Sequence, residues 1–375
     1  MKRTLGKGVR MPVRFGLIGC GDVAFRTYIP GIQAVSEWAT VVATFDPILD
    51  RAQRAAALFP GATAYTSYDD FLQHQDMDGV FNLTPAPLHY ATTSRALDAG
   101  LHVFSEKPLA STVEEGKALI AQAKRLGRYL LCAPAVMATG RFRWLKHELA
   151  AGRIGSPHLA TGQMANLGPA AWLEYTGDPA VFYSKSVGPL LDTGVYVLHA
   201  ITGLLGPARR VEAFGGIAIP ERTVLIERLA GQTIRVESND VMLVHLDFGE
   251  NRFAQVLSSF AVPRTKAPAL EVYGPQGTVS ISMERWYEAN GPVDLFLLDK
   301  GWQHDVCPPP PLMPSSDHLI GSGPAHFVAV LRDEEAPILT AEHALHVLDI
   351  ILKAQQSAQE GRALDLEPVA DGRLA

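Results

Sequence analysis

A lysine stands at the end of a short apolar segment, where no structural task for it is evident. The stretch LHVFSEKPLA begins as a buried strand would and continues into Glu106, Lys107 and Pro108. Because proline lacks an N–H group and disfavours the helical region for the residue before it, we expect Lys107 to be held extended. A partly desolvated lysine near another positive charge has a lowered pKa and can transfer protons near neutrality. Lys107 is therefore a candidate catalytic residue; the alternative is a solvated lysine at a strand end.

Three further polar residues share one predicted helix in the second half of the chain. The stretch GPLLDTGVYVLH carries Asp192, Tyr196 and His199 at positions i, i+4 and i+7, a spacing that places them on one helix face. Polar groups aligned on an apolar helix are costly to bury without a purpose. A tyrosine can transfer protons, and an aspartate can orient a hydroxyl group. We interpret Asp192 and Tyr196 as catalytic candidates and His199 as a structural histidine.

A glycine-rich turn near the start of the chain predicts a dinucleotide site. In GLIGCGDVA, Gly19, Gly21 and Ala24 form the pattern G-x-G-x-x-A between an apolar strand and a helix. Gly19 would make the tight turn, Gly21 would let the backbone approach a pyrophosphate, and Ala24 would allow close helix packing. The alternative is a tight turn whose small residues serve packing alone. The expected cofactor contacts of this turn are Gly19, Cys20, Gly21, Asp22 and Val23.

Asp46 ends the second expected strand and bears on the choice of cofactor. Its carboxylate can accept hydrogen bonds from both ribose hydroxyls, which favours NAD because a 2′-phosphate would meet a negative charge. The alternative is a turn aspartate before Pro47. Arg51 and Arg54 follow closely in the chain, so NADP also stays open.

Two more turns fall at the carboxyl edge of the predicted sheet, where open α/β sheets bind ligands. NLTPAPLHY, at the end of the expected strand 79–83, contributes Thr84, Pro85 and His89 as expected cofactor contacts, although His89 could equally be a histidine on the helix surface. Glu106 and Lys107, after the expected strand 102–104, would face the nicotinamide end of the dinucleotide.

The elements that position these residues follow from alternating patterns. Apolar runs are separated by helical patterns such as 51–59, which predicts an α/β fold: a doubly wound parallel sheet of the Rossmann type with helices on both faces. The helix Ser111–Leu126 is expected to begin with a capping box formed by Ser111 and Glu114. We place this dinucleotide-binding domain at residues 12–134. The strand candidates are 13–18, 40–45, 79–83, 102–104 and 129–132.

The pattern changes at about Pro134. A helix is expected over residues 141–152, followed by alternating stretches that predict antiparallel strands with one covered face. We therefore expect residues 135–375 to form an α+β domain for substrate binding and oligomerisation, with a large open, mostly antiparallel sheet. Its last helix can pack back on the first domain. The strand candidates lie at 239–248, 252–260 and 269–274.

Composition excludes several classes of protein. With 375 residues, 47% hydrophobic and 19% charged, the chain is long enough for two cores and too apolar for disorder. A net charge of −6 without a long basic run argues against nucleic-acid binding, and no apolar run is long enough to span a bilayer. Residues 1–10 lack the apolar core of a secretion signal and are interpreted as a loose tail or an over-long start, so we expect a cytoplasmic protein.

The cysteines and histidines indicate no metal site. Three widely separated cysteines suit a reducing cytosol, and their spacing favours neither a disulfide framework nor zinc. His343 and His346 fall at i and i+3 of a terminal helix without a third ligand, so we interpret them as a solvated helix face. The cysteines are Cys20, Cys132 and Cys307.

Together these motifs resemble one family. Glu106-Lys107-Pro108, downstream of G-x-G-x-x-A and T-P-x-P-x-x-H, is similar to the pattern of the glucose–fructose oxidoreductase, inositol 2-dehydrogenase and rhizopine-catabolism family, Gfo/Idh/MocA. GPLLDTGVYVLH resembles the family's second-domain motif with two departures: Tyr196 replaces the common histidine, and His199 replaces the final acid. A tyrosine here resembles the branch that holds glucose–fructose oxidoreductase, aldose 1-dehydrogenases and dihydrodiol dehydrogenases. The resemblance runs from about Val13 to the last helix.

The resemblance implies an oxidoreductase that transfers a hydride between NAD, or alternatively NADP, and a secondary alcohol or hemiacetal carbon of a sugar or polyol. Tyr196 would transfer the proton, and Lys107 would polarise the same oxygen and lower the pKa of the tyrosine. Asp192 would orient the substrate hydroxyl or Lys107.

A loop-rich stretch before the second-domain helix could complete the substrate site. Its aromatic side chains, Trp172 and Tyr183 among them, could stack on a sugar ring; the alternative is ordinary packing. The expected substrate contacts are Asn166 and Tyr175 from this stretch, with Lys107, Asp192 and Tyr196.

Two other functions stay open within the resemblance. Some members hydrolyse glycosides with an internally recycled NAD, and others bind the cofactor as regulators without catalysis. Retention of Lys107, Asp192 and Tyr196 argues against a regulator, since a sensor needs no proton-transfer set. The resemblance also implies a homodimer or homotetramer that pairs through the second-domain sheet.

Overall fold

The chain divides into two compact units. The computed structural model describes residues 4–5, 9–311 and 314–369. The first unit comprises Met1–Ala138 and Pro311–Leu345, and the second comprises Thr139–Pro310 and His346–Ala375.

The predicted loose tail contains a short hairpin. Strands β1 (Thr4–Leu5) and β2 (Val9–Arg10) pair antiparallel, where the sequence predicted no regular structure. Residues 1–3 and 6–8 of that tail lie outside the described residues.

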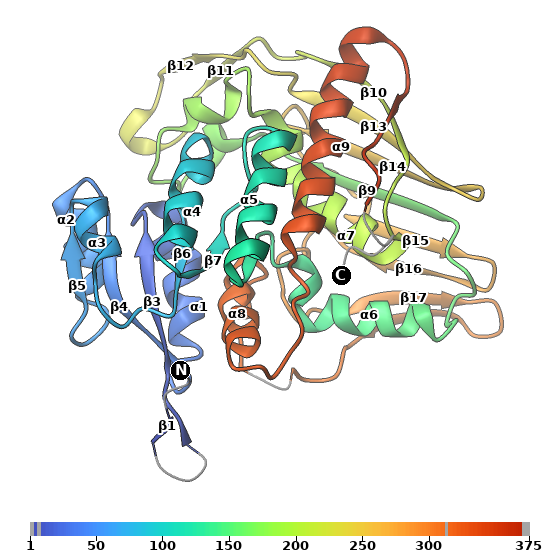
Figure 1. Cartoon of the computed structure of the whole chain (residues 1–375). Helices are drawn as coiled ribbons and strands as arrows, with labels where there is room; N and C mark the ends of the chain where they lie inside the picture. The colour runs from blue at the N-terminus through green and yellow to red at the C-terminus, as the bar shows by residue number, and fades with distance from the viewer. Residues whose placement is uncertain (1–3, 6–8, 312–313, 370–375) are drawn as a thin grey trace. The chain divides into compact units, whose positions relative to one another are not determined.

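The first unit is built on a six-stranded sheet whose pairings are all parallel (Figure 1). The order β5-β4-β3-β6-β7-β8 confirms the predicted doubly wound sheet, with its topological switch between β3 and β6. The strands are β3 (Val13–Ile18), β4 (Ala39–Phe45), β5 (Thr63–Tyr65), β6 (Gly79–Asn82), β7 (His102–Ser105) and β8 (Leu130–Cys132). The helices are α1 (Ile29–Gln33), α2 (Leu49–Ala56), α3 (Tyr68–Leu72), α4 (His89–Asp98), α5 (Val113–Leu126) and α8 (Gly323–Leu331).

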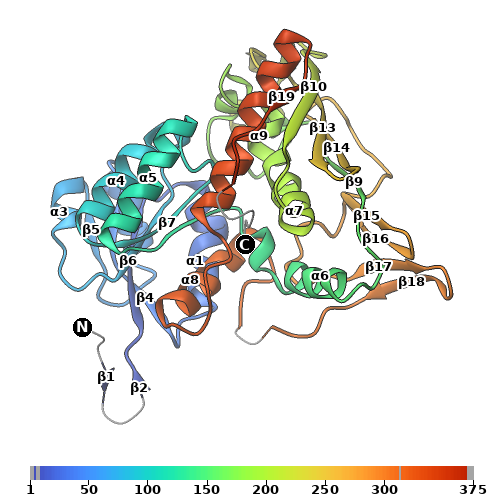
Figure 2. The same ribbon diagram turned by 45° about the vertical axis from the view of Figure 1, so that its right-hand side comes forward.

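The inner strands of this sheet, such as β3, β6 and β7, are buried on both faces, as a parallel sheet with two helical layers requires. Val80 of β6 joins the core cluster that includes Leu97 of α4 and Leu119 of α5. Its neighbour Phe81 points to the other layer, since its ring lies 5.4 Å from that of Phe327 on α8. Successive residues therefore serve the two helical layers, which can be followed in Figure 2.

Helix α5 begins one residue later than the capping box predicted from the sequence. Thr112 is the N-cap: its hydroxyl accepts from the Glu115 N–H at 3.1 Å, and the Glu115 carboxylate accepts from the Thr112 N–H at 3.3 Å. The predicted box of Ser111 and Glu114 is therefore wrong. The run S-T-V-E-E offers two overlapping frames, and in the second frame Glu115 also accepts from the Ser111 N–H.

The second unit is built on a nine-stranded sheet in the order β18-β17-β16-β15-β9-β14-β13-β10-β19. Among the described strands of this sheet, the parallel pairing is that of β14 with β9, which confirms the predicted mostly antiparallel sheet. The strands are β9 (Leu159–Ala165), β10 (Arg210–Gly216), β13 (Val241–Gly249), β14 (Arg252–Ser259), β15 (Leu270–Gly274), β16 (Gly277–Ile281), β17 (Val293–Leu297), β18 (Gly301–Val306) and β19 (Leu364–Asp365).

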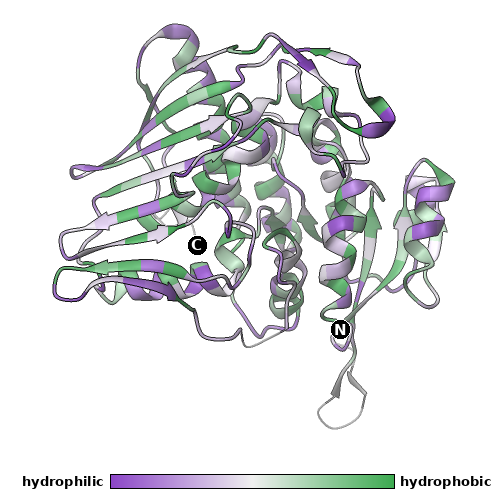
Figure 3. Cartoon of the chain, turned by 180° about the vertical axis from the view of Figure 1, so that it is seen from behind, coloured by the Kyte–Doolittle hydropathy of each residue, from purple (hydrophilic) through white to green (hydrophobic). Residues whose placement is uncertain are grey.

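One face of this sheet is covered and the other is exposed. Along β13, Met242, Val244 and Leu246 are buried, whereas Leu243 and His245 between them are exposed. Helix α7 (Val195–Leu205) lies on the covered face against β9 and β14, and α6 (Gly140–Ala150) packs on α7. Hydrophobic and hydrophilic positions accordingly occur along the same strands in Figure 3.

The remaining elements are a long helix and a small sheet. Helix α9 (Ala341–Glu360) begins with Ala341 and Ala344 in the core of the first unit. Strands β11 (Glu221–Thr223) and β12 (Thr233–Arg235) pair with each other within the segment of chain that connects β10 to β13. Within the described ranges, none of these helices has the length and apolarity needed to cross a membrane.

Candidate functional site

The glycine-rich turn leaves β3 in the conformation that the motif requires. Gly19 has a φ of +89°, and a Cβ there would lie 2.8 Å from the Leu83 carbonyl oxygen. A Cβ at Gly21 would meet no protein atom within 4 Å, which leaves open space over the turn for a ligand. Ala24 is fully buried and begins a π-helical turn. These residues therefore fit a dinucleotide phosphate group held against the turn.

Asp46 braces this turn from the end of β4. Its Oδ2 accepts from the Cys20 N–H at 2.9 Å, and its Oδ1 accepts from the Ile48 N–H at 2.9 Å. The carboxylate is 4% exposed, and these two contacts are those of a turn aspartate. Each carboxylate oxygen can accept a second hydrogen bond, so a ribose contact stays a prediction.

Charged side chains flank the turn. The half-buried Asp22 pairs with Arg26 at 2.9 Å, and the Arg54 guanidinium lies 5.0 Å from the centre of the Phe25 ring. Burial, and then the Asp46 carboxylate, raise the pKa of the Cys20 thiol to about 12. Cys20 is therefore a packed thiol and not a nucleophile.

A buried asparagine organises the turn after β6, and the sequence analysis missed it. Asn82 is fully buried: its Oδ1 accepts from the Thr84 hydroxyl at 2.7 Å, and its Nδ2 donates to the Thr93 hydroxyl at 2.9 Å. Pro85 follows in an exposed position and precedes a 3-10 turn. The signal for Asn82 was a polar residue at the end of the apolar run 79–83.

His89 joins two of the predicted turns. It is 1% exposed, so the alternative of a helix-surface histidine is wrong. Its Nδ1 lies 2.6 Å from the Pro108 carbonyl oxygen, and its Nε2 lies 2.8 Å from that of Thr84. Burial lowers the pKa of His89, and the two carbonyl acceptors oppose this effect. His89 therefore ties the Thr84 turn to the Lys107 turn.

Lys107 is half-buried at the carboxyl edge of the sheet, in a turn built by its neighbour. Glu106 is 7% exposed; its Oε1 accepts from the Tyr28 hydroxyl at 2.7 Å, and its Oε2 accepts from the Lys107 N–H at 2.9 Å. The Glu106 N–H donates to the Asn82 carbonyl oxygen at 2.8 Å. The Glu106 carboxylate is thus fixed on two donors, and nothing in the sequence had pointed to Tyr28.

The second unit carries the other predicted catalytic residues on one continuous helical segment. Asp192 lies in a π-helical turn, Leu190–Gly194, that leads into α7 with Tyr196 and His199. All three are buried, with exposed fractions of 6%, 6% and 4%. Because a π turn is wider than an α turn, straight-helix spacing does not describe Asp192, and such turns are frequent at functional sites. The ring of Tyr287 meets that of Tyr196 edge-on.

The histidines near this helix are structural groups. Burial, and then the His346 imidazole, lower the pKa of His199 to about 3. His346 accepts from the Ala208 N–H at 3.1 Å, and burial, then the Lys353 ammonium, lower its pKa to about 4. His343 and His346 are 1% and 4% exposed, so the predicted solvated face is wrong. Ala344, Val347 and Leu348 beside them are buried as well, so this part of α9 has no solvated face at these positions.

The predicted substrate loop has a packed part and a half-exposed part. Tyr183 is buried: its hydroxyl accepts from the Ala170 N–H at 3.1 Å, so it serves packing. Tyr175 is half-buried, and its ring lies 5.6 Å from that of Phe182. Asn166, also half-buried, forms a turn in which its Oδ1 accepts from the Gly168 N–H at 2.7 Å.

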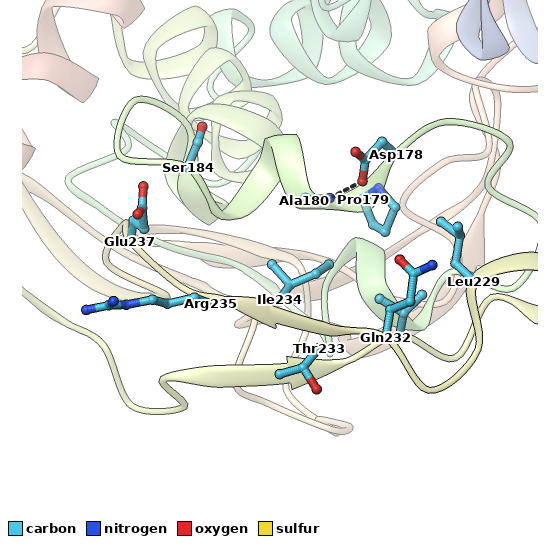
Figure 4. Close-up of a pocket in the computed structure, with 11 residues that line it drawn as sticks. Asp178, Pro179, Ala180, Ser184, Leu229, Gln232, Thr233, Ile234, Arg235 and Glu237 are labelled. Atoms are coloured by element: carbon cyan, nitrogen blue, oxygen red, sulfur yellow. Dashed lines mark hydrogen bonds between the residues drawn. The ribbon is translucent and has the colours of Figure 1, made fainter.

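A pocket of about 390 Å³ lies beside the small sheet of the second unit. Figure 4 shows Asp178 and Pro179 on one side and Ile234 of β12 on another, with the Asp178 carboxylate accepting from the Ala180 N–H at 2.9 Å. Its lining includes none of the predicted site residues. In the described part of the chain, no group of three or more His, Cys, Asp or Glu side chains is placed to hold a metal ion.

Two family models match the chain. Residues 13–133 match the oxidoreductase family with an NAD-binding Rossmann fold, and residues 142–280 match the GFO/IDH/MocA C-terminal domain. A crystal structure of an NAD binding oxidoreductase from Klebsiella pneumoniae has the same fold, with a TM-score of 0.80 at 20% identity over 96% of this chain and 100% of that chain.

Curated relatives match over shorter stretches. The chain is 34% identical over 220 residues to the uncharacterized oxidoreductase ORF334 of Rhizobium meliloti, which covers 58% of this chain and 60% of that protein. It is 28% identical over 281 residues to the dTDP-3,4-didehydro-2,6-dideoxy-alpha-D-glucose 3-reductase of Streptomyces violaceoruber, which covers 71% of this chain and 79% of that protein. The chain thus spans about three fifths of the first relative's length. The matches to both halves confirm the resemblance read from the motifs: the chain belongs to the Gfo/Idh/MocA family of NAD-binding oxidoreductases.

Proposed function

We propose that this chain is an NAD(P)-dependent oxidoreductase that transfers a hydride between the nicotinamide and a CH–OH carbon of a sugar, polyol or related compound. The observation that carries the proposal is the turn of Lys107 at the carboxyl edge of a dinucleotide-binding sheet, where a buried carboxylate with two donors fixes the backbone of the lysine. In such sheets this edge is where ligands bind. We further propose residues 12–134 as the dinucleotide-binding domain and residues 135–375 as the domain for substrate binding and oligomerisation.

The cofactor would lie over the glycine turn. Gly19 to Val23 would contact its pyrophosphate, and the open space at Gly21 supports this. Because the N–H groups of Gly19 and Cys20 donate to the Phe45 carbonyl oxygen and the Asp46 carboxylate, the donors to the pyrophosphate would be those of Gly21, Asp22 and Val23. Asp46 would accept from the adenosine ribose, which favours NAD over NADP. Thr84, Pro85 and His89 would border the cofactor along the sheet edge, and Glu106 and Lys107 would border its nicotinamide. When bound, the nicotinamide supplies the acceptor or donor of the hydride.

The proton of the reacting hydroxyl would pass to this chain's own side chains. We assign proton transfer to Tyr196, with the Lys107 ammonium polarising the same oxygen and lowering the pKa of the phenol. Asp192 would orient the substrate hydroxyl or Lys107. Asn166 and Tyr175 would supply further contacts to a carbohydrate-like substrate, since both are half-exposed in a loop that precedes the Asp192 turn.

Relatives favour net redox chemistry over the alternatives. The Streptomyces violaceoruber relative is named as a sugar 3-reductase, which supports a ketone or alcohol carbon of a sugar as the reacting centre. A glycosidase with recycled NAD would release sugar without net NADH, and a regulator would turn over nothing.

The three cysteines are free, which supports a reducing, cytoplasmic location.

A substrate panel tests this function. Sugars, sugar acids and inositols are offered with NAD and with NADP, and the absorbance of the reduced cofactor is followed. We expect reduced cofactor to accumulate, and faster with NAD. Lys107→Ala and Tyr196→Phe should each lower turnover by about 100-fold or more while cofactor affinity is kept. Normal turnover in Tyr196→Phe would remove Tyr196 as the proton carrier, and release of sugar from an added glycoside without NADH would favour the glycosidase.

We also propose that the chain forms a homodimer or homotetramer through the exposed face of the nine-stranded sheet. Two rows of apolar side chains cross this face. In one, Phe214 of β10 lies opposite Leu243 of β13. In the other, Phe253 of β14 lies opposite Leu159 of β9. All four are exposed, and such rows favour contact with a second protein surface.

A further inference from the structure

The loop of residues 285–291 is held by a buried arginine from another part of the second unit. Arg141, in the first turn of α6, has a fully buried side chain. Its Nε donates to the Gly291 carbonyl oxygen at 2.8 Å, and its Nη2 donates to those of Arg285 at 2.8 Å and Glu288 at 2.6 Å. One guanidinium therefore fixes three backbone carbonyls of a single short loop with charge-assisted hydrogen bonds.

A second anchor holds the same loop. Trp286 is fully buried, and its ring lies 5.8 Å from that of Phe142, at 73°. A Cβ at Gly291 would collide with the Arg141 guanidinium, so the loop backbone approaches the arginine as closely as it can. Burial lowers the pKa of Arg141 to about 10, which leaves it charged at neutral pH. Burying a cation to hold a loop is costly, so the loop conformation must matter to the molecule.

Tyr287 follows the tryptophan anchor directly. It is half-buried, and its ring lies 5.9 Å from that of Tyr196 at an interplanar angle of 76°. This is the edge-to-face arrangement that aromatic pairs prefer. Tyr196 is 6% exposed and lies on α7, so the anchored loop supplies one wall against its phenol ring.

From these contacts we infer that Tyr287 is a positioning residue for Tyr196, and that Arg141 keeps Tyr287 in place by gripping the 285–291 loop. The inference rests on the proposed function, in which Tyr196 transfers the proton. Proton transfer requires the phenol oxygen to lie within hydrogen-bond reach of the reacting hydroxyl, and a displacement of about 1 Å can cost roughly 100-fold in rate. Tyr287 acts through the ring contact and exchanges no proton itself.

The test compares four variants of the full chain. Tyr287→Ala should lower kcat by about 10- to 100-fold with little change in KM, because an interaction that matters only in the transition state is weakened. Tyr287→Phe keeps the ring and should restore most of the turnover. Arg141→Lys keeps the charge but loses the fixed fork of donors, so kcat should fall in the same direction. Glu284→Ala, whose side chain is 79% exposed in the adjoining turn, is the matched control.

Two further measurements separate the outcomes. Cofactor dissociation constants should stay unchanged in every variant. In protein labelled with 3-fluorotyrosine, the fluorine signal that Tyr196→Phe removes should shift in Tyr287→Ala, since a neighbouring ring has gone. The inference is overturned if Tyr196→Phe is inactive while Tyr287→Ala has wild-type kcat and KM. If the wild-type chain neither oxidises nor reduces a compound of the panel with NAD or NADP, the proposed function fails by itself. An unshifted Tyr196 signal in Tyr287→Ala would then overturn the ring contact too. If Arg141→Lys does not fold, the comparison of Tyr287→Ala with Tyr287→Phe still tests the inference.

Discussion

The lysine proposed to act on substrate depends for its position on the carboxylate beside it. Glu106 is nearly buried, and a buried carboxylate is stable only when donors surround it. Two donors do so, the Tyr28 hydroxyl and the Lys107 N–H. Tyr28 comes from the π-helical turn after the glycine motif, so the cofactor turn and the lysine turn share a side chain. Removal of the Tyr28 hydroxyl should therefore change the position of Lys107.

We expect Tyr28→Phe to lower both stability and turnover. Removing a hydrogen bond to a charged group should lower the free energy of unfolding by about 1.5–3 kcal/mol. Turnover should fall because the Glu106 carboxylate can then rotate away from the Lys107 N–H. Urea denaturation and initial rates with the best sugar measure the two effects.

Tyr68→Phe is the matched control. Tyr68 is half-buried, and its hydroxyl donates to the Thr92 carbonyl oxygen at 2.7 Å in the same unit, far along the chain from Lys107. It should lose about 1 kcal/mol of stability and keep its turnover. Equal turnover in the two variants would contradict a link between Tyr28 and the lysine.

Sequence reasoning at this scale found the residues that follow strand ends and missed their partners. Lys107 and the glycines of the turn after β3 were predicted because each belongs to a short sequence motif. Tyr28 and Asn82 were not, because their hydrogen bonds join segments that only the folded sheet brings together. The sequence analysis placed His89 in the correct turn but left its role open, because its two carbonyl partners belong to two different turns.

At the scale of elements, the apolar strands were predictable even where they are short, and the short, partly exposed strand β5 was not. The mainly apolar run 13–18 is β3 to the residue, because a strand buried on both faces is apolar at most of its positions; Arg14, near its start, is partly exposed. Strand β5 has three residues and is partly exposed, so no pattern singled it out. The two π-helical turns were read as ordinary helix, since residue spacing records only the α period.

The N-terminus of α5 gives a direct test at this scale. Because Thr112 is the observed cap, Thr112→Ala should lower the free energy of unfolding by about 1 kcal/mol. Ser111→Ala should change it little, since Ser111 takes part through its backbone N–H. Thermal and urea unfolding measure both. If Ser111→Ala lowered the free energy of unfolding more than Thr112→Ala, the capping box of Ser111 and Glu114 predicted from the sequence would be supported instead.

Helices α7 and α9 carry buried histidines that make stability depend on pH. The pKa values of His199 and His346 are lowered to about 3 and about 4, against 6.5 for an unfolded chain. Their contribution is complete above about pH 6.5 and is lost as the pH falls, because the unfolded chain binds protons that the folded chain does not. The free energy of unfolding should fall by up to about 1.4 kcal/mol per pH unit for each histidine below that pH.

Urea denaturation between about pH 7 and pH 5 measures this slope. His199→Asn should flatten it by about one proton. A wild-type slope that stays flat below about pH 6.5 would mean that these imidazoles take up protons in the folded state.

At the scale of the whole molecule, the residues proposed for catalysis are divided between the two units, and those proposed for assembly belong to one. Lys107 belongs to the first unit, whereas Tyr196 and the Tyr287 loop belong to the second. The alternating pattern of the second-half strands predicted an open sheet with one apolar face in the core. It did not predict that Phe214, Leu243 and Phe253 would add apolar side chains to the other face, since exposed and buried apolar positions look alike in a sequence.

The assembly is tested by placing charge in these rows. The double variant Leu243→Glu, Phe253→Glu puts two carboxylates on the exposed face of β13 and β14, and a symmetric contact would bring them near their own copies. Like charges opposed across an interface cost several kcal/mol, which is enough to dissociate a micromolar complex. We expect wild type to sediment as a dimer or tetramer at micromolar concentration and the double variant as a monomer with unchanged circular dichroism. Leu58→Glu, 44% exposed on the first unit, should sediment as wild type does. A monomeric wild type would contradict the proposed assembly. A double variant that stays assembled would show that the interface lies on another surface.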